Sequence, residues 1–323
     1  MAVFAACAPV RQTALEPAGA PAAPRFEDDA FVSFDGARLG LTVWEGEGAS
    51  GEAPWAVVVG VHGMNDYANA FHMAAPAWAA EGVTTYAYDQ RGFGRSPNRG
   101  VWPEEELMRE DLRTAVSLAR AKHPDALLAV VGISMGGAVA MTAFGSDRPP
   151  EGVDRLVLSG PGLRGWGALP WSYRISLWLS AHIRPDWVVV PPRQVAVTIT
   201  PSDNVEMRRR LWDDPLGLKN NRIDAVHGVV SVMEHAHEVA HKLPENTLVL
   251  YGAKDQVIPP NAFARTVPEL PAHVKGLYYE NGYHMLQRDL QAAIVHEDVL
   301  AFLKDPNADA PSGSPDLPWR ASF

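Results

Sequence analysis

The sequence predicts an α/β protein with a mostly parallel sheet of eight strands, helices on both faces, and a helical cap inserted after the sixth strand. Two observations lead to this prediction. From Phe31 onward, short apolar runs alternate with longer stretches of helical periodicity, which is typical of strands joined by crossover helices. Between Pro161 and Pro244 the alternation stops over a span too long for a plain connection, and this indicates an inserted structure.

The expected strands begin with an antiparallel pair. The runs Phe31 to Phe34 and Leu39 to Trp44 flank the turn dipeptide Asp35-Gly36, which favours a tight reversal of the chain. The later runs are short and continuously apolar, as strands buried on both faces are. These parallel strands are expected at residues 56–61, 84–88, 127–133, 156–159, 247–251 and 276–279.

Helical periodicity fills the intervals between these runs, and each interval is long enough for a crossover helix. We expect these helices at residues 71–81, 104–122, 135–144, 261–267 and 290–303.

The predicted domains are a core of residues 26–160 and 245–304 and a cap of residues 161–244. Residues 1–25 are expected to form a flexible tail or tether, and residues 305–323, rich in Pro, Ser, Gly and Asp, a loose C-terminal tail. Tryptophans in the cap could line an apolar pocket, but we expect them mainly to fill the cap core. They are Trp166, Trp171, Trp178, Trp187 and Trp212.

The charge balance argues against a polyanionic partner. The chain has 28 basic and 38 acidic residues, a formal charge of −10, so nucleic acid would be repelled at long range. The run Arg208 to Arg210 is read as the solvated face of a helix. The single cysteine excludes an internal disulfide and a multi-cysteine metal site.

That cysteine, Cys7, follows two alanines and precedes an Ala/Pro-rich stretch, a pattern that resembles the end of a bacterial lipoprotein signal. Only six residues precede it, fewer than a signal peptide needs. Two expectations follow: a cytoplasmic protein with an idle thiol, or, if the true start lies upstream, a lipoprotein attached to a membrane surface through Cys7. No run approaches the roughly 18 apolar residues of a membrane span.

The motif Gly132-Ile133-Ser134-Met135-Gly136 carries the strongest chemical signal. It joins an apolar strand to a helix, the context in which a serine on a strained turn becomes an exposed nucleophile. Flanking glycines let neighbouring backbone approach the turn closely. We therefore predict Ser134 as the nucleophile; the alternative is an ordinary turn with a capping serine.

A serine hydroxyl needs a base, and the base needs a carboxylate to fix its tautomer. Of the 11 histidines, His284 lies between the last strand and the last helix, where the fold returns to the edge that carries Ser134. Asp255 follows the preceding strand, so the chain order is Ser, Asp, His. We predict that these three residues form a catalytic triad.

Two backbone N–H groups should stabilise the oxyanion of an acyl-transfer intermediate. Met135, next after the nucleophile, supplies one, and Met64 in the loop after the third strand supplies the other. We read His62 in that loop as a residue that shapes the turn rather than as a second base. This chemistry requires no cofactor and no metal.

Short motifs that follow predicted strands, or lie in the cap, extend through the chain: His62-Gly63-Met64, Asp89 to Ser96, Gly132 to Gly137, Trp212 to Leu216, Tyr251 to Asp255 and Tyr283-His284. Together they resemble the monoacylglycerol lipase and lysophospholipase branch of the α/β-hydrolase superfamily, with its S33-type serine aminopeptidase domain. The resemblance implies the α/β-hydrolase fold and an apolar acyl tunnel under the cap. It implies removal of a single acyl chain from glycerol or from a lysophospholipid.

One departure concerns the polar end of the substrate, because Asn65-Asp66-Tyr67 stands where the branch usually has Gly-Glu-His. The segment Asp89 to Ser96 matches no phosphate-binding spacing, and we read it as an element that shapes a loop.

The sequence thus predicts a serine hydrolase that cleaves carboxylic esters, with a small acyl ester or lipid as its partner. Amide or peptide cleavage, or acyl transfer to an alcohol, would use the same triad. A non-catalytic binding protein on this scaffold is a separate alternative. Haloalkane dehalogenases and epoxide hydrolases are disfavoured because their nucleophile is an aspartate. Sequence leaves the oligomeric state open.

Overall fold

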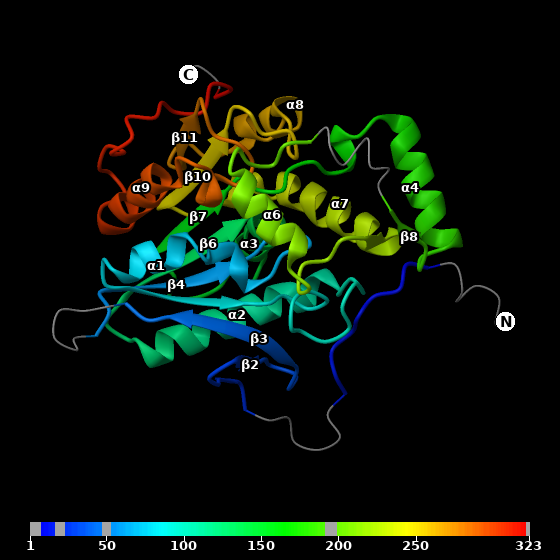
Figure 1. The fold of residues 1–323 in the computed structure, drawn as a ribbon, viewed down its shortest axis with the longest axis horizontal. Coiled ribbons are helices and arrows are strands. Elements are labelled where there is room, and N and C mark those ends of the chain that lie inside the picture. The colour runs from blue at the N-terminus through cyan, green and yellow to red at the C-terminus, as the bar shows by residue number, and fades with distance from the viewer. Residues whose placement is uncertain (1–7, 17–22, 47–52, 191–198, 321–323) are drawn as a thin grey trace.

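The computed structural model describes residues 8–16, 23–46, 53–190 and 199–320 (Figure 1). Cys7 lies outside these ranges, so its lipid attachment stays a prediction.

In the described residues, one sheet of nine strands runs through the protein in the order β1-β2-β3-β5-β4-β6-β7-β10-β11 (Figure 1). The six strands from β5 to β11 are parallel, and the first three are antiparallel at one edge. This is the mostly parallel sheet that the sequence predicts. The strands are β1 (Arg25–Phe26), β2 (Ala30–Val32), β3 (Arg38–Trp44), β4 (Ala56–Val61), β5 (Val83–Tyr88), β6 (Leu127–Ile133), β7 (Arg155–Ser159), β10 (Thr247–Gly252) and β11 (Lys275–Tyr279).

The predicted count of eight strands was wrong by one. The extra strand, β1, pairs with β2 through Arg25 opposite Val32 and Phe26 opposite Phe31. A strand of two residues forms no apolar run of its own, so periodicity could not detect it.

Helices cover both faces of the sheet. The β4 residues Val57 and Val59 join the hydrophobic cluster beneath α2, α3 and α7, whereas Val58 joins the cluster beneath α1 and α9. This alternation reflects the two-residue period of a strand, and it buries β4 on both sides. The core helices are α1 (Ala74–Ala79), α2 (Glu105–Lys122), α3 (Met135–Phe144), α7 (Ile223–Glu238), α8 (Pro260–Ala264) and α9 (Ala292–Lys304), with 3-10 turns η2 (Ala68–Phe71), η4 (Ala240–Lys242), η5 (Val267–Glu269) and η6 (Leu286–Arg288).

The insertion after β7 is mostly helical, but it also holds a short antiparallel ladder that the sequence did not indicate. Figure 1 shows α4 at one end of the molecule, beyond α7. No helix in the described ranges is both long and apolar enough to cross a membrane. The elements before α7 are η3 (Trp166–Ala168), α4 (Trp171–Ile183), β8 (Val188–Val189), α6 (Val205–Asp213) and β9 (Asn221–Arg222).

The last helix of the predicted cap belongs to the core layer. Helix α7 packs on α3, and Val229, Val232 and Met233 lie in the main hydrophobic cluster. The cap boundary at residue 244 stays a prediction, and the packing of α7 places this helix between the core and the rest of the insertion.

Both predicted tails differ from the expected loose chain where the structure describes them. At the N-terminal end, Gln12 is buried and exchanges backbone hydrogen bonds with Trp102 (2.9 Å) and Glu104 (3.0 Å). At the C-terminal end, Leu317 is buried and Trp319 packs on the ring of Tyr251. Composition indicated disorder, but hydrogen bonds of Gln12 hold the first segment and the apolar side chains of Leu317 and Trp319 hold the second.

Candidate active site

Ser134 lies at the junction between β6 and α3, in a strained backbone conformation with φ 52° and ψ −119°. The flanking glycines make this turn sterically feasible. A Cβ atom on Gly136 would lie 2.1 Å from the Val61 carbonyl oxygen, and one on Gly132 would lie 2.7 Å from the Gly136 carbonyl oxygen. The motif thus holds the serine in a sharp turn that larger residues would prevent.

The three predicted triad residues meet at the carboxyl ends of parallel strands. His284 Nε2 is 2.9 Å from Ser134 Oγ, and His284 Nδ1 is 2.7 Å from Asp255 Oδ2. The other oxygen of Asp255 accepts N–H bonds from Val257 (2.8 Å) and Ile258 (2.9 Å). This carboxylate is therefore held in place, and it fixes the imidazole with its proton on Nδ1 and the acceptor nitrogen toward the serine.

The lack of a side chain on Gly160 lets the loop that carries His284 pack closely against the end of β7. Gly160 follows β7 with φ +50°, and a Cβ there would lie 3.1 Å from the carbonyl oxygen of His284. Ser134, Asp255 and His284 are all buried in the described structure. Water therefore has little access to the hydrogen bonds among them, which strengthens those bonds.

The predicted oxyanion loop lies directly against the nucleophile. A Cβ on Gly63 would be 3.1 Å from Ser134 Cβ and 3.7 Å from Ser134 Oγ, so the backbone of Gly63, the residue before Met64, borders the hydroxyl. Met135 begins α3, where the first N–H groups have no partner within the helix. Among the hydrogen bonds of the described residues, neither the Met64 nor the Met135 N–H has an acceptor.

His62 is fully buried, and both of its ring nitrogens are hydrogen-bonded to backbone groups, which fits the expected role of shaping the turn. Its Nε2 accepts the Gln90 N–H at 2.8 Å, so Nδ1 carries the proton and donates to the Gly63 carbonyl at 2.7 Å. Burial lowers the pKa of His62, which keeps the ring neutral.

The segment Asp89 to Ser96 also shapes the structure. Asp89 accepts backbone N–H bonds from Ala68 (2.9 Å) and Arg95 (2.8 Å). Arg91 is buried between the carboxylates of Asp35 and Asp111, with N to O distances of 2.8 and 2.7 Å. These contacts fit the predicted loop-shaping role.

The segment Asn65-Asp66-Tyr67 connects three parts of the site, a role that sequence reasoning missed. Asp66 pairs with Arg288 at 2.6 Å, and both side chains are buried. The Tyr67 hydroxyl donates to Asp214 in the cap at 2.7 Å, and the Asn65 carbonyl accepts the Leu218 N–H at 2.9 Å. The available signal was an arginine in a short loop directly after His284, where a charge requires a partner if it is buried.

The cap carries apolar surface rather than a closed core. The expectation that its tryptophans mainly fill a core was wrong, because Trp171, Trp178, Trp187 and Trp212 are more than half exposed. Helix α4 packs on α7 with one side only, and its other side faces solvent. A cavity of about 500 Å³ lies between them, lined by Trp166, Arg174, Ile175, Trp178, Leu179 and His227.

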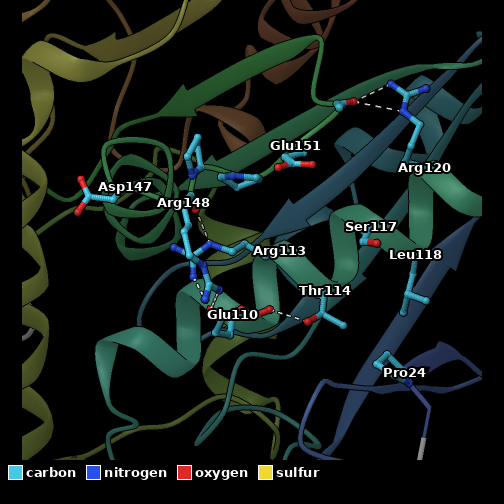
Figure 2. A pocket seen from close by; sticks show the side chains of 13 residues that line it. Pro24, Glu110, Arg113, Thr114, Ser117, Leu118, Arg120, Asp147, Arg148 and Glu151 are labelled. Atoms are coloured by element: carbon cyan, nitrogen blue, oxygen red, sulfur yellow. Dashed lines mark hydrogen bonds and ion pairs between the residues drawn. The ribbon is translucent and has the colours of Figure 1, made fainter.

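A second hollow, of about 980 Å³, lies over α2 and the loop after α3 (Figure 2). Its charges neutralise one another: Glu110 pairs with Arg113 (2.9 Å) and Arg148, and Arg120 pairs with Asp154 (2.7 Å). No predicted site residue lines it. The described residues contain no group of three or more His, Cys, Asp or Glu side chains that could hold a metal ion.

Comparison with known proteins agrees with this fold. Residues 52–291 match the family model described as serine aminopeptidase, S33. A curated monoacylglycerol lipase of Mycolicibacterium smegmatis is 28% identical over 294 residues, which is 85% of this chain and 96% of that protein.

Two solved structures share the fold. A monoglyceride lipase of Saccharomyces cerevisiae aligns with a TM-score of 0.71 and 18% identity, over 85% of this chain and 94% of that one. A monoacylglycerol lipase of Paleococcus ferrophilus aligns with a TM-score of 0.67 and 20% identity, over 82% of this chain and 98% of that one. Since the family model covers well over half of the sequence and the fold agrees, the chain belongs to the serine aminopeptidase S33 family of α/β-hydrolases.

Proposed function

We propose that this protein hydrolyses carboxylic esters through a triad of Ser134, His284 and Asp255. The observation that carries the proposal is the unbroken chain of contacts from Ser134 Oγ to His284 Nε2 (2.9 Å) and from His284 Nδ1 to Asp255 Oδ2 (2.7 Å). A serine so connected can lose its proton as it attacks a carbonyl carbon.

The reaction proceeds in two acyl-transfer steps. Ser134 Oγ attacks the ester carbonyl while its proton passes to His284 Nε2, and the oxyanion accepts hydrogen bonds from the Met64 and Met135 N–H groups. The imidazolium, stabilised by Asp255, then protonates the leaving alcohol, which leaves an acyl-enzyme. His284 next takes a proton from water, the hydroxide attacks the acyl carbon, and the acid leaves as Ser134 regains its proton.

The substrate we favour is a monoacylglycerol or a lysophospholipid. The names of the relatives support this choice, as does the apolar cavity between α4 and α7, which suits an acyl chain. The family description as an aminopeptidase keeps amide cleavage as the second candidate. Monoacylglycerols, lysophospholipids and amino-acid anilides, compared at equal concentration, separate the candidates: we expect the highest kcat/KM on a glycerol or lysophospholipid ester.

The triad is tested by Ser134→Ala. We expect kcat on a p-nitrophenyl ester to fall by about 10³-fold or more, because the nucleophile is lost. Labelling by a fluorophosphonate probe should disappear with it. The control is Ser146→Ala, in which a serine just beyond α3 is replaced without touching the site. A Ser134→Ala variant that keeps most of its activity, or a wild type that the probe does not label, contradicts the proposal.

A further inference from the structure

A buried ion pair joins two of the loops that the proposed reaction uses. Asp66 Oδ2 lies 2.6 Å from Arg288 Nη2, and the side chains are 7% and 4% exposed. We propose that Asp66 and Arg288 are positioning residues, which hold the Met64 N–H at a fixed place relative to His284. This inference rests on the proposed function, since it concerns the geometry of the same triad and oxyanion site.

The two loops come from distant parts of the sheet. One follows β4 and the other follows β11, with β6, β7 and β10 between them. Four strand spacings amount to about 19 Å, so the sheet itself gives the loops no common anchor. In the described chain, no backbone hydrogen bond joins residues 62–73 to residues 280–291. The ion pair is thus a direct link that the backbone does not provide.

Each end of the pair is tied closely to a reacting group. Asp66 lies two residues after Met64, and its N–H donates to the Gly63 carbonyl at 3.3 Å. Arg288 lies four residues after His284 in η6, where its N–H donates to the Met285 carbonyl at 2.7 Å. A shift of either side chain therefore moves the backbone next to a donor or a base.

Neither charge has a substitute partner in the described structure. Asp66 is the only carboxylate paired with Arg288, and Arg288 Nη1 has no hydrogen-bond acceptor. Loss of one partner leaves a buried charge without compensation, and the loop that carries it must move toward water. Loss of both partners leaves no unpaired buried charge, but it also removes the ion pair that joins the two loops.

Comparison of the single variants with the double variant distinguishes a pair that positions the loops from a pair that only stabilises the fold. An oxyanion donor acts at about 2.7–3.1 Å, and a misplacement of about 1 Å costs on the order of 100-fold in rate. If the pair only stabilised the fold, its loss would lower activity only by lowering the fraction of enzyme that is folded. A positioning pair affects kcat in a fully folded enzyme.

The experiment compares Asp66→Asn, Arg288→Met and the double variant on a p-nitrophenyl ester. We expect kcat to fall by about 10- to 100-fold in each, with KM within about threefold. We expect the double variant to regain part of the thermal stability that the single variants lose, because it has no unpaired buried charge, while its kcat stays low. If kcat returns to the wild-type value with stability, or if the single variants keep it, the inference is overturned.

Two further variants keep the test decisive. Asp35→Asn removes a buried carboxylate from Arg91; both residues lie outside residues 62–73 and 280–291, and the change should lower stability without changing kcat of the folded enzyme. If the single variants do not fold, Arg288→Lys retains the charge without the planar fork, and its kcat should still fall severalfold; wild-type kcat there contradicts positioning. Ser134→Ala separates the two ideas. A Ser134→Ala variant that keeps most of its activity refutes the triad, whereas normal kcat in the Asp66 and Arg288 variants refutes only the link.

Discussion

At the scale of single residues, the turn at Ser134 depends on local geometry that can be predicted from the sequence motif. Ser134 adopts φ 52°, and Gly132 and Gly136 leave the space that the turn requires. Such a motif is predictable because all of its parts are neighbours in the chain. The partner of Arg288 was not predictable, because Asp66 lies 222 positions away and only the folded loops bring them together.

Replacement of Gly136 by alanine tests the steric argument. The new Cβ would lie 2.1 Å from the Val61 carbonyl oxygen, so backbone must shift. We expect a loss of about 3 kcal/mol in the free energy of unfolding and a reduced kcat, measured by urea denaturation and ester hydrolysis. Gly217→Ala, where the nearest atom lies at 3.4 Å, should be nearly neutral. Wild-type stability in Gly136→Ala would refute the argument.

Asp255→Asn tests the tautomer of the histidine. The amide oxygen can still accept the Val257 and Ile258 N–H bonds, but the amide nitrogen would then face His284 Nδ1 and donate to it. The ring proton would move to Nε2, which could no longer accept the serine proton. We expect kcat to fall by about 10⁴-fold with the fold intact, measured with a p-nitrophenyl ester and circular dichroism. The exposed Asp125→Asn serves as control, and a loss below about tenfold would argue against this role.

At the scale of elements, α4 and α7 show that hydrophobic periodicity does not predict where a helix packs. Both helices have amphipathic sequences, yet α7 packs into the core while α4 exposes apolar side chains. Periodicity identifies an apolar face but not what covers it, so the position of α7 followed only from its packing on α3. His227 belongs to α7, and its ring packs against Trp166 and against His182 of α4.

His227 should make the stability of this region sensitive to acid. Burial, with the nearby Arg11 and His182, lowers the pKa of His227 to about 4, whereas the unfolded chain titrates near 6.5. The stabilisation is complete above pH about 6.5 and is lost as the pH falls toward 4, because the unfolded chain binds the proton first. Urea denaturation at pH 7 and pH 5 should show a smaller drop in His227→Phe than in the wild type.

The exposed His241→Phe controls for a general effect of removing a histidine. Other groups titrate in the same range, so only the difference between variants reports on His227. Equal drops in His227→Phe and the wild type would exclude this imidazole as a source of acid sensitivity.

At the scale of the whole molecule, most of the sheet and the proximity of the three candidate triad residues were predictable, while the packing of the ends of the chain was not. Most of the parallel strands are short runs rich in Val, Leu and Ile, which hydrophobic patterning detects, and the order Ser134, Asp255, His284 is the one that this topology requires. The tail after α9 looks disordered by composition. Its packing depends on Leu317 and Trp319, two side chains that no periodic pattern marks.

Leu317→Ala tests whether this tail stabilises the fold. The side chain is 3% exposed, and its truncation should lower the free energy of unfolding by about 2–4 kcal/mol. Since Leu317 lies against Gly276 in β11 and is not a residue of the triad, kcat of the folded enzyme should not change. Leu15→Ala, at a position 48% exposed, is the matched control in urea denaturation. An unchanged midpoint in Leu317→Ala would mean that the tail contributes nothing.

The position of this tail also bears on how copies of the protein behave toward one another. Strand β11 is the outermost strand on its side of the sheet, and an edge strand with free N–H groups can template a β-strand from another molecule. Here the Tyr278 N–H donates to the Pro315 carbonyl at 2.8 Å, and the tail crosses Gly276, where a Cβ would lie 2.5 Å from Leu317 Cγ. Residues 315–317 thus cover part of this edge and occupy one N–H group with which a strand of another molecule could pair, so we expect removal of the residues after α9 to favour intermolecular sheet pairing.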